Sequence, residues 1–337
     1  MTATNVTNPI FDFNLSLLSK WRQELMGGGT LLILICHAYG NNVVMPTMIE
    51  RIVDNAQIGV DLFLLLSGIG IAFSLNKTVV GSGCQSLGAW YIHRFQRIYV
   101  PFLILMCLYY VYKIPFEGES WLTAFLDIAN IGWWINGKGT WYISLILLLY
   151  VFAPILYRWL IGSKYSWLYL IVLCCAIWII FQDDFNSPLH YVNNAIKRAP
   201  AFFIGMALTP YVKTGVKTNL LWLSIISCVA FVIAYNLLPL GFCKWIVILP
   251  FTMALAIIIE HIQIVRKPLS FLGMISLESY LANVTLGDIL NHKSWILWGH
   301  DLSYGHYLEY TLVVVLGLLL AWMVNKASKQ ILFNISK

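Results

Sequence analysis

Long apolar runs separated by short polar stretches dominate the pattern of this chain. Their lengths predict ten membrane-spanning helices, near residues 28–47, 57–76, 94–114, 140–160, 166–183, 198–212, 218–237, 241–262, 268–290 and 307–329. The apolar stretch 120–135 is shorter, contains Asp127 and is rich in aromatic residues, which favours an interfacial or re-entrant segment. The pattern therefore predicts an all-α polytopic membrane protein. Residues 1–25 form its N-terminal cytoplasmic or interfacial segment, and residues 26–337 form its transmembrane domain.

Composition agrees with this pattern. Of the 337 residues, 60% are hydrophobic and only 11% are charged, whereas soluble domains carry about 25% charged residues. A large soluble helical domain is thereby excluded, and the modest net charge of +6 gives no nucleic-acid signal. The first twenty residues lack a basic start and a small-residue cleavage site, so the first membrane helix is expected to serve as the signal.

Basic residues predict the orientation of the chain. With ten spans and a cytoplasmic N-terminus, two thirds of the 21 Lys and Arg residues fall in inside segments. The positive-inside rule thus predicts that both termini are cytoplasmic, and an eleventh span would remove the asymmetry. We expect a multi-pass membrane protein. No internal repeat is visible, which slightly disfavours a transporter.

An imidazole and a carboxylate lie inside two consecutive apolar runs. His37 is in the first predicted span and Asp61 is near the outer start of the second. Intramembrane ionisable groups are costly and mark candidate functional sites. A His–Asp pair suits general-base catalysis, with the carboxylate fixing the tautomer of the imidazole. The alternatives are a helix-packing hydrogen bond for His37 and a helix N-cap for Asp61.

Two arginines enter the third predicted span from the inside. Arg94 and Arg97 are three residues apart and share a helix face, where their guanidinium groups suit the bidentate binding of phosphates. The alternative is anchoring to lipid headgroups. Tyr91 precedes them and fits an aromatic belt under either interpretation.

Further candidates lie at the predicted outer face and in a late span. Trp141, Tyr142 and Ser144 form an aromatic–hydroxyl cluster that suits contact with a sugar or an acyl group, although Trp141 fits an interfacial anchor equally well. Arg198 opposes the positive-inside trend, which suggests a role beyond topology. Glu278 is a second intramembrane acid, either functional or paired within the bundle.

No metal site is expected from the sequence. His292, His300 and His306 lie in a predicted outer loop at spacings that match no metal site, and a solvated loop is the favoured interpretation.

Several segments, taken in order, resemble the integral membrane acyltransferase-3 family. The first is Gly59-Val60-Asp61-Leu62-Phe63 followed by Ser67-Gly68, with His37 in the helix before it. The others are Tyr91…Arg94…Arg97…Pro101, Trp141-Tyr142-Ile143-Ser144, Arg198-Ala199-Pro200…Phe203…Gly205 and Ser276…Tyr280-Leu281. The resemblance covers residues 20–330. Two positions depart from the family pattern: Met26 stands where an arginine is usual, and Asn283 where a histidine is frequent.

The resemblance implies an O-acyltransferase of the cytoplasmic membrane of a bacterium. Members of the family acylate, and mostly acetylate, exported or cell-surface carbohydrates with an acyl group from cytoplasmic acyl-coenzyme A. His37 is then the catalytic residue, with Asp61 orienting it. Arg94, Arg97 and Tyr91 contact acyl-CoA, which acts as a co-substrate without a tightly bound cofactor. From their residue types and positions, we expect that Trp141, Tyr142, Ser144, Arg198 and Glu278 contact the carbohydrate acceptor.

Two other classes of function remain open on the sequence. The first is a transporter or flippase for a glycan or lipid, in which the intramembrane His, Asp and Glu residues relay protons. The second is a membrane scaffold without enzymatic activity. Consumption of a thioester separates the enzyme from both, because neither a transporter nor a scaffold consumes acetyl-CoA.

Overall fold

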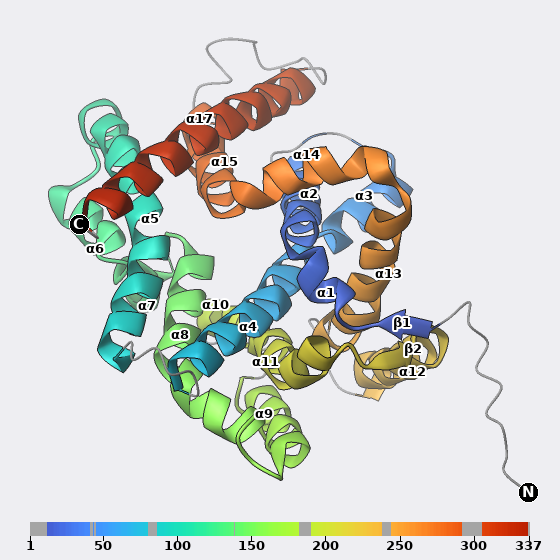
Figure 1. Ribbon diagram of the computed structural model, residues 1–337. Coiled ribbons are helices and arrows are strands. Elements are labelled where there is room, and N and C mark those ends of the chain that lie inside the picture. The colour runs from blue at the N-terminus through green and yellow to red at the C-terminus, as the bar shows by residue number, and fades with distance from the viewer. Residues whose placement is uncertain are drawn as a thin grey trace, which may run out of the picture. The chain divides into compact units, whose positions relative to one another are not determined.

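The computed structural model describes residues 12–40, 43, 45–79, 86–137, 139–181, 190–237, 244–291 and 305–335, which are almost entirely helical (Figure 1). Within these ranges the one sheet is an antiparallel pair of short strands, β1 (Asp12–Asn14) and β2 (Lys217–Asn219). Phe13 pairs with Thr218 in the centre of that register. The predicted all-α class is thereby confirmed.

The helices follow the apolar runs of the sequence. In chain order they are α1 (Leu17–Lys20), α2 (Arg22–Gly40), α3 (Thr47–Asn55), α4 (Ile58–Val79), α5 (Leu87–Glu117), α6 (Trp121–Ile128), α7 (Gly132–Asn136), α8 (Trp141–Leu160), α9 (Ser166–Ile180), α10 (His190–Ile196), α11 (Ala199–Thr214), α12 (Leu220–Leu237), α13 (Ile248–His261), α14 (Gln263–Met274), α15 (Ser276–Asn291) and α17 (Gly305–Ile335). A 3-10 turn, η2 (Lys244–Ile246), precedes α13.

Several helices are long and apolar enough to cross a bilayer. Within the described part of the chain, four segments meet both conditions: Thr47–Thr78, Leu87–Glu117, Trp141–Leu160 and Tyr307–Ile335. A fifth span results if α14 and α15, which meet at a bend of 70°, are counted together. Three further apolar helices, Ser166–Ile180, Leu220–Ala234 and Ile248–His261, have 15 residues or fewer and are at most about 22 Å long at about 1.5 Å per residue. A bilayer core is about 30 Å thick. The protein is therefore a membrane protein, and the total of ten spans stays a prediction.

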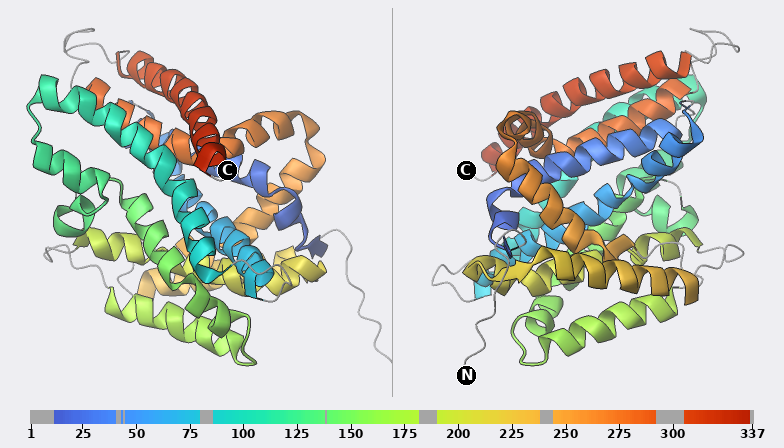
Figure 2. Two further views of the ribbon diagram at one scale, coloured as in Figure 1. Left: turned by 60° about the vertical axis from the view of Figure 1, so that its left-hand side comes forward. Right: turned by 90° about the vertical axis from the view of Figure 1, so that its right-hand side faces the viewer.

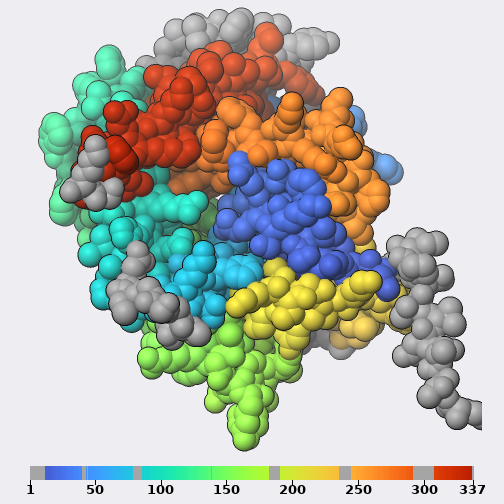
Figure 3. All heavy atoms as spheres, in the orientation of Figure 1, coloured from blue at the N-terminus to red at the C-terminus, as the bar shows by residue number. Residues whose placement is uncertain are grey.

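Large apolar side chains cover the outer faces of several helices. On α17 they include Leu308, Val315, Leu319 and Met323, each at least half exposed. Figure 3 shows this helix, in red, at the surface. The helices α9 and α12 carry similar exposed Ile, Val and Trp side chains. Soluble monomers rarely expose apolar surface on this scale, so these faces are suited to contact with lipid chains.

The stretch 120–135 does not form one helix. The short helices α6 and α7 flank a break at Asn130, which has a positive φ of 57°. Two tyrosines of α5 hold the stretch: the Tyr99 hydroxyl donates to the carbonyl oxygen of Ile128 at 2.8 Å, and the Tyr110 hydroxyl donates to Asp127. The prediction that this stretch is not a span is confirmed, because neither helix is long enough to cross the bilayer.

The chain divides into two compact units built from interleaved segments. The first unit contains residues 1–26, 61–76 and 153–270, and the second contains residues 27–60, 77–152 and 271–337. In the first unit, the apolar side chains of α4 form much of the core, and Leu62, Leu64, Leu65, Leu66 and Ile69 are fully buried. In the second unit, α15 packs along α17, as both views of Figure 2 show, and α5 contacts both helices.

Candidate functional site

The side chain of His37 lies half-buried on α2, within the second unit. Its Nδ1 atom is 2.5 Å from the Oδ1 atom of Asn283 on α15, and Asn283 is only 2% exposed. One turn before His37 on the same helix, the carbonyl oxygen of Leu34 accepts a hydrogen bond from the hydroxyl of Tyr310 on α17. Thus α15 contacts the imidazole that the sequence predicts to be catalytic, and α17 contacts α2 one turn before it.

A row of aromatic rings links His37 to the predicted acceptor residues. The ring of Tyr280, one turn before Asn283 on α15, lies 6.2 Å from the imidazole. The ring of Tyr142, in the first turn of α8, lies edge-on to Tyr280 at 5.5 Å, and Trp141 lies edge-on to Tyr142 at 6.1 Å. The structure therefore brings His37, Tyr142 and Trp141 into one cluster, with Tyr280 as the connecting ring.

A cavity of about 280 Å³ lies beside Arg94 in the same unit. Tyr91 and Ser144 also line it, so two residues predicted to contact coenzyme A share one cavity with a residue predicted to contact the acceptor. The remaining lining residues are Phe95, Asn130, Trp134, Leu147, Leu148, Tyr150 and Val151. The lining is mostly apolar, and among the described residues that line it Arg94 supplies the positive charge. Such a cavity suits a ligand whose buried part is largely apolar and which carries a negative charge.

Hydrogen bonds connect the helices whose residues line this cavity. The Tyr91 hydroxyl donates to the carbonyl oxygen of Val151 at 2.7 Å, which ties α5 to α8. The Ser144 hydroxyl donates to Oδ1 of Asn130 at 2.8 Å, which ties α8 to the break between α6 and α7. Tyr142 and Ser144 are two residues apart on a helix and point to opposite sides. The His37 cluster and the cavity therefore flank opposite sides of the first turn of α8.

Arg97 lies outside the residues that line the cavity, although it shares a helix face with Arg94. Its guanidinium is exposed and lies close enough to Glu278 for the two charges to interact. Glu278 is buried in the first turn of α15 and accepts a hydrogen bond from Asn325 of α17 at 2.9 Å. Its contacts fit the bundle-packing alternative, and its predicted role in acceptor binding stays a prediction.

Asp61 pairs with Arg198 in the first unit. The guanidinium donates to the carboxylate at 2.8 Å, and both side chains are almost completely buried. Lys244 adds a second positive charge to the electrostatic environment of Asp61. Arg198 sits at the N-terminal end of α11, so its departure from the positive-inside trend has a structural reason: it neutralises a buried carboxylate. His37 belongs to the second unit, and the role of Asp61 in orienting it stays a prediction.

Two glycines of the resembling segments let α4 and α11 meet backbone to backbone. A Cβ atom at Gly68 would lie 2.2 Å from the carbonyl oxygen of Phe202, and one at Gly205 would lie 2.1 Å from that of Leu65. Both distances are far below any real contact, so no larger residue fits without separating the helices. Small residues at such crossings are common in membrane bundles. Asp61 belongs to α4 and Arg198 caps the N-terminus of α11, so the buried ion pair joins the same two helices.

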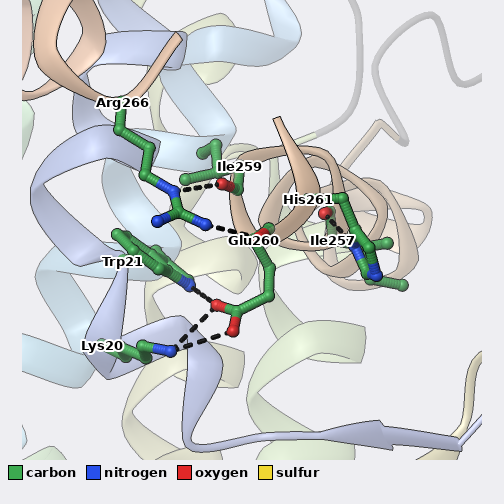
Figure 4. A network of polar contacts seen from close by, with 7 residues as sticks. All are labelled: Lys20, Trp21, Ile257, Ile259, Glu260, His261 and Arg266. Carbon is green, nitrogen blue, oxygen red and sulfur yellow. Dashed lines mark hydrogen bonds and ion pairs between the residues drawn. The ribbon is translucent and has the colours of Figure 1, made fainter. Parts of the chain in front are cut away.

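Arg22 and the residues before it are tied into the first unit. The Arg22 guanidinium lies against Gly70 and donates from Nε to the carbonyl oxygen of Leu66 at 3.2 Å. In the network of Figure 4, both carboxylate oxygens of Glu260 are used: Lys20 donates at 3.0 Å, and the indole of Trp21 donates as well. Arg266 lies over the Trp21 ring at 4.5 Å. These contacts support a structural role for this segment.

Sequence reasoning did not identify three residues of the second unit as site residues. Tyr280 belongs to the segment Ser276…Tyr280-Leu281, but its aromatic neighbours lie on other helices. Asn283 departs from the family pattern, and Asn130 lies in the stretch 120–135, whose pattern favours an interfacial segment. Of the predicted outer-loop histidines, His292 and His300 lie outside the described residues. Among all the residues that the structure describes, no group of His, Cys, Asp or Glu has the geometry of a metal site.

The fold and these clusters define a helical membrane protein with a half-buried histidine and a mostly apolar cavity beside an arginine. A family model described as an acyltransferase domain, Acyl_transf_3, matches residues 27–326. The match covers most of the chain, and the protein belongs to this acyltransferase-3 family. The resemblance drawn from the sequence motifs is thereby confirmed. Neither the comparison with curated proteins nor that with solved structures gives a match.

Proposed function

We propose that this protein is a ten-span O-acyltransferase that moves an acyl group, by default acetyl, from cytoplasmic acyl-CoA to a hydroxyl group of an exported or cell-surface glycan. The observation that carries the proposal is that one compact unit of an acyltransferase-family domain holds both the His37 cluster and the cavity beside Arg94. A base and a binding site for an anionic donor are the two requirements of acyl transfer from coenzyme A.

The donor binds at the end of the unit where Arg94 and Arg97 lie. Coenzyme A carries several phosphate charges, and paired guanidinium groups bind phosphates through charge-assisted hydrogen bonds. Arg94 lines the cavity, and Arg97 is exposed one turn further along α5. One guanidinium group therefore lies at the cavity and the other on the adjoining surface. The apolar part of the lining, including Leu147 and Leu148, suits the alkyl parts of the coenzyme arm and acyl group.

His37 acts as the general base. It removes the proton of the acceptor hydroxyl, whose oxygen attacks the thioester carbonyl carbon. The carbon–sulfur bond breaks, and the proton passes from the imidazole to the departing thiolate of coenzyme A. This exchange releases one ester and one thiol and leaves His37 unchanged. General-base catalysis of this kind contributes about 10²–10⁴-fold to the rate.

The acceptor lies against the aromatic row. Trp141 and Tyr142 are the outermost rings of the row that leads to His37. Flat rings pack well against the apolar faces of sugars, and the phenol of Tyr142 adds a polar group. Trp141 is partly exposed, whereas Tyr142 is buried, so the row leads from an accessible ring to a buried one.

The proposal is tested with full-length protein in proteoliposomes supplied with radiolabelled acetyl-CoA and a surface-glycan extract. We expect release of coenzyme A thiol together with base-labile label in the glycan. Protein with an inactive donor site, the Arg94→Ala/Arg97→Ala double variant, is the matched control. Movement of glycan across the bilayer without any consumption of acetyl-CoA would instead identify a transporter and contradict the proposal.

A further inference from the structure

Asn283 contacts the imidazole through an atom that only accepts hydrogen bonds. Its Oδ1 atom lies 2.5 Å from Nδ1 of His37. An amide oxygen carries no hydrogen, so the hydrogen of this bond belongs to Nδ1 of the imidazole. The second ring nitrogen, Nε2, is then the one with the lone pair when the ring is neutral. The contact therefore selects one of the two neutral tautomers of His37.

Asn283 and the imidazole lie among side chains of three helices. The residue is 2% exposed on α15, which packs along α17 in Figure 2. Tyr310 of α17 donates to the Leu34 carbonyl oxygen, one turn before His37. Tyr280, one turn before Asn283, places its ring 6.2 Å from the imidazole. The ring is thus held by Asn283 at Nδ1, with Tyr280 close by.

We propose that Asn283 is a positioning residue for His37: it holds the Nδ1–H tautomer, so that Nε2 is the atom that takes the proton of the acceptor hydroxyl. This inference rests on the proposed function for its catalytic meaning. Asn283 stands where the family pattern frequently has a histidine, and a neutral amide performs this task without adding a charge to the buried site. The balance of the reaction is unchanged: the proton moves from the hydroxyl oxygen to Nε2 and from Nε2 to the thiolate of coenzyme A.

The tautomer is measured directly by nitrogen NMR of full-length protein labelled with ¹⁵N-histidine in detergent micelles. The His37 signals are those that disappear in His37→Gln. We expect them to show a protonated Nδ1 and an unprotonated Nε2 in the parent protein at neutral pH. In Asn283→Leu, which removes the amide but keeps its approximate size, we expect a mixture of the two tautomers. A parent protein with its hydrogen on Nε2 would overturn the inference.

Activity variants then test the catalytic meaning. We expect Asn283→Leu to lower kcat for acetyl transfer by at least about tenfold, because misplacing the base forfeits part of its 10²–10⁴-fold contribution. Asn283→Asp places a carboxylate beside the imidazole and stabilises its protonated form. Because the base must be unprotonated, the acidic limb of the pH–rate profile should move to higher pH. Thr285→Val is the matched control, because Thr285 is buried on the same helix and its hydroxyl donates to the carbonyl oxygens of Leu281 and Ala282.

The outcomes separate this inference from the proposed function. If the parent protein transfers acetyl groups and His37→Ala does not, unchanged kcat and an unmoved pH profile in the Asn283 variants would overturn the inference alone. If the parent protein transfers no acetyl group while the NMR spectrum shows the expected tautomer, the proposed function fails and the assignment of the tautomer stands.

Discussion

At the scale of single residues, the buried pair of Asp61 and Arg198 makes a clear stability prediction. Arg198→Met leaves the buried carboxylate without its partner, and breaking a buried ion pair typically costs about 3–5 kcal/mol. The double variant Asp61→Asn/Arg198→Met removes the charge as well and should recover most of that loss. Thermal unfolding in detergent, followed by tryptophan fluorescence, ranks the variants by Tm.

The control for this comparison is Arg158→Met, since Arg158 is exposed and its removal should leave Tm unchanged. A double variant that unfolds at the same temperature as Arg198→Met would show that the pair is not the source of the stability.

The two arginines of α5 carry the donor-binding prediction. Losing one charge-assisted hydrogen bond costs about 1.5–3 kcal/mol, so Arg94→Ala and Arg97→Ala should each weaken coenzyme A binding about tenfold or more. Because Arg94 also lines the cavity, its removal should have the larger effect. Calorimetric titration of coenzyme A into each purified variant measures the affinity, with Arg158→Ala as the control. If both variants bind coenzyme A as tightly as the parent protein, the arginines do not contact the coenzyme and serve only to orient the chain in the membrane.

Residue types were predictable from the sequence, but their partners were not. An imidazole in an apolar run is conspicuous because of its cost in a membrane. Its contact with Asn283 joins residues that are 246 positions apart, and no local pattern encodes such a distance. The same limit applies to Asp61, whose nearest candidate partner along the chain was His37, whereas the structure pairs it with Arg198 across 137 positions.

At the scale of helices, the crossing of α4 and α11 depends on two glycines. Gly205→Val places side-chain atoms where the carbonyl oxygen of Leu65 now lies, so we expect loss of folded protein. Gly88→Ala is the matched control: its Cβ meets nothing closer than 3.8 Å, and alanine favours a helix by about 1 kcal/mol over glycine. Size-exclusion chromatography of detergent extracts measures the folded fraction. A monodisperse Gly205→Val variant would contradict the observed crossing.

Element boundaries show what hydropathy detects and what it misses. The first predicted span began at residue 28, but α2 already begins at Arg22, because the guanidinium is satisfied by a carbonyl oxygen of α4. The helix α3 was not predicted. Its apolar residues Met48, Ile49 and Ile52 are exposed on one face, a pattern typical of a helix at the membrane surface. Charged residues between them lower the average hydropathy of the segment, so a search for long apolar runs does not detect it.

At the scale of the whole molecule, the distribution of charges predicts that both termini are cytoplasmic. Alkaline phosphatase fused after Lys337 should be inactive in a bacterial host, because the enzyme matures only outside the cytoplasm, whereas green fluorescent protein at the same position should fluoresce. A fusion after Lys113, which is predicted to lie in an outer segment, is the control with the opposite pattern. Active phosphatase at the C-terminus would mean an odd number of spans or an inverted orientation.

Class and family followed from the sequence because both rest on long apolar runs and on ordered motifs. The division into two compact units did not, since each unit combines segments from three separate parts of the chain. Four helices, α2, α4, α8 and α14, contribute to both units, and an apolar run gives no sign of where such a boundary falls. The placement of His37 and Asp61 in different units is a consequence of this interleaving.

The central claim is that His37 is the base for acyl transfer, and the most direct test compares acetyl transfer by His37→Ala and the parent protein. The account predicts a loss of at least about 10²-fold in His37→Ala at equal expression and equal Tm. His261→Ala, an exposed histidine that bonds the backbone of its own helix, should retain full activity. Turnover by purified His37→Ala near that of the parent protein would contradict the account.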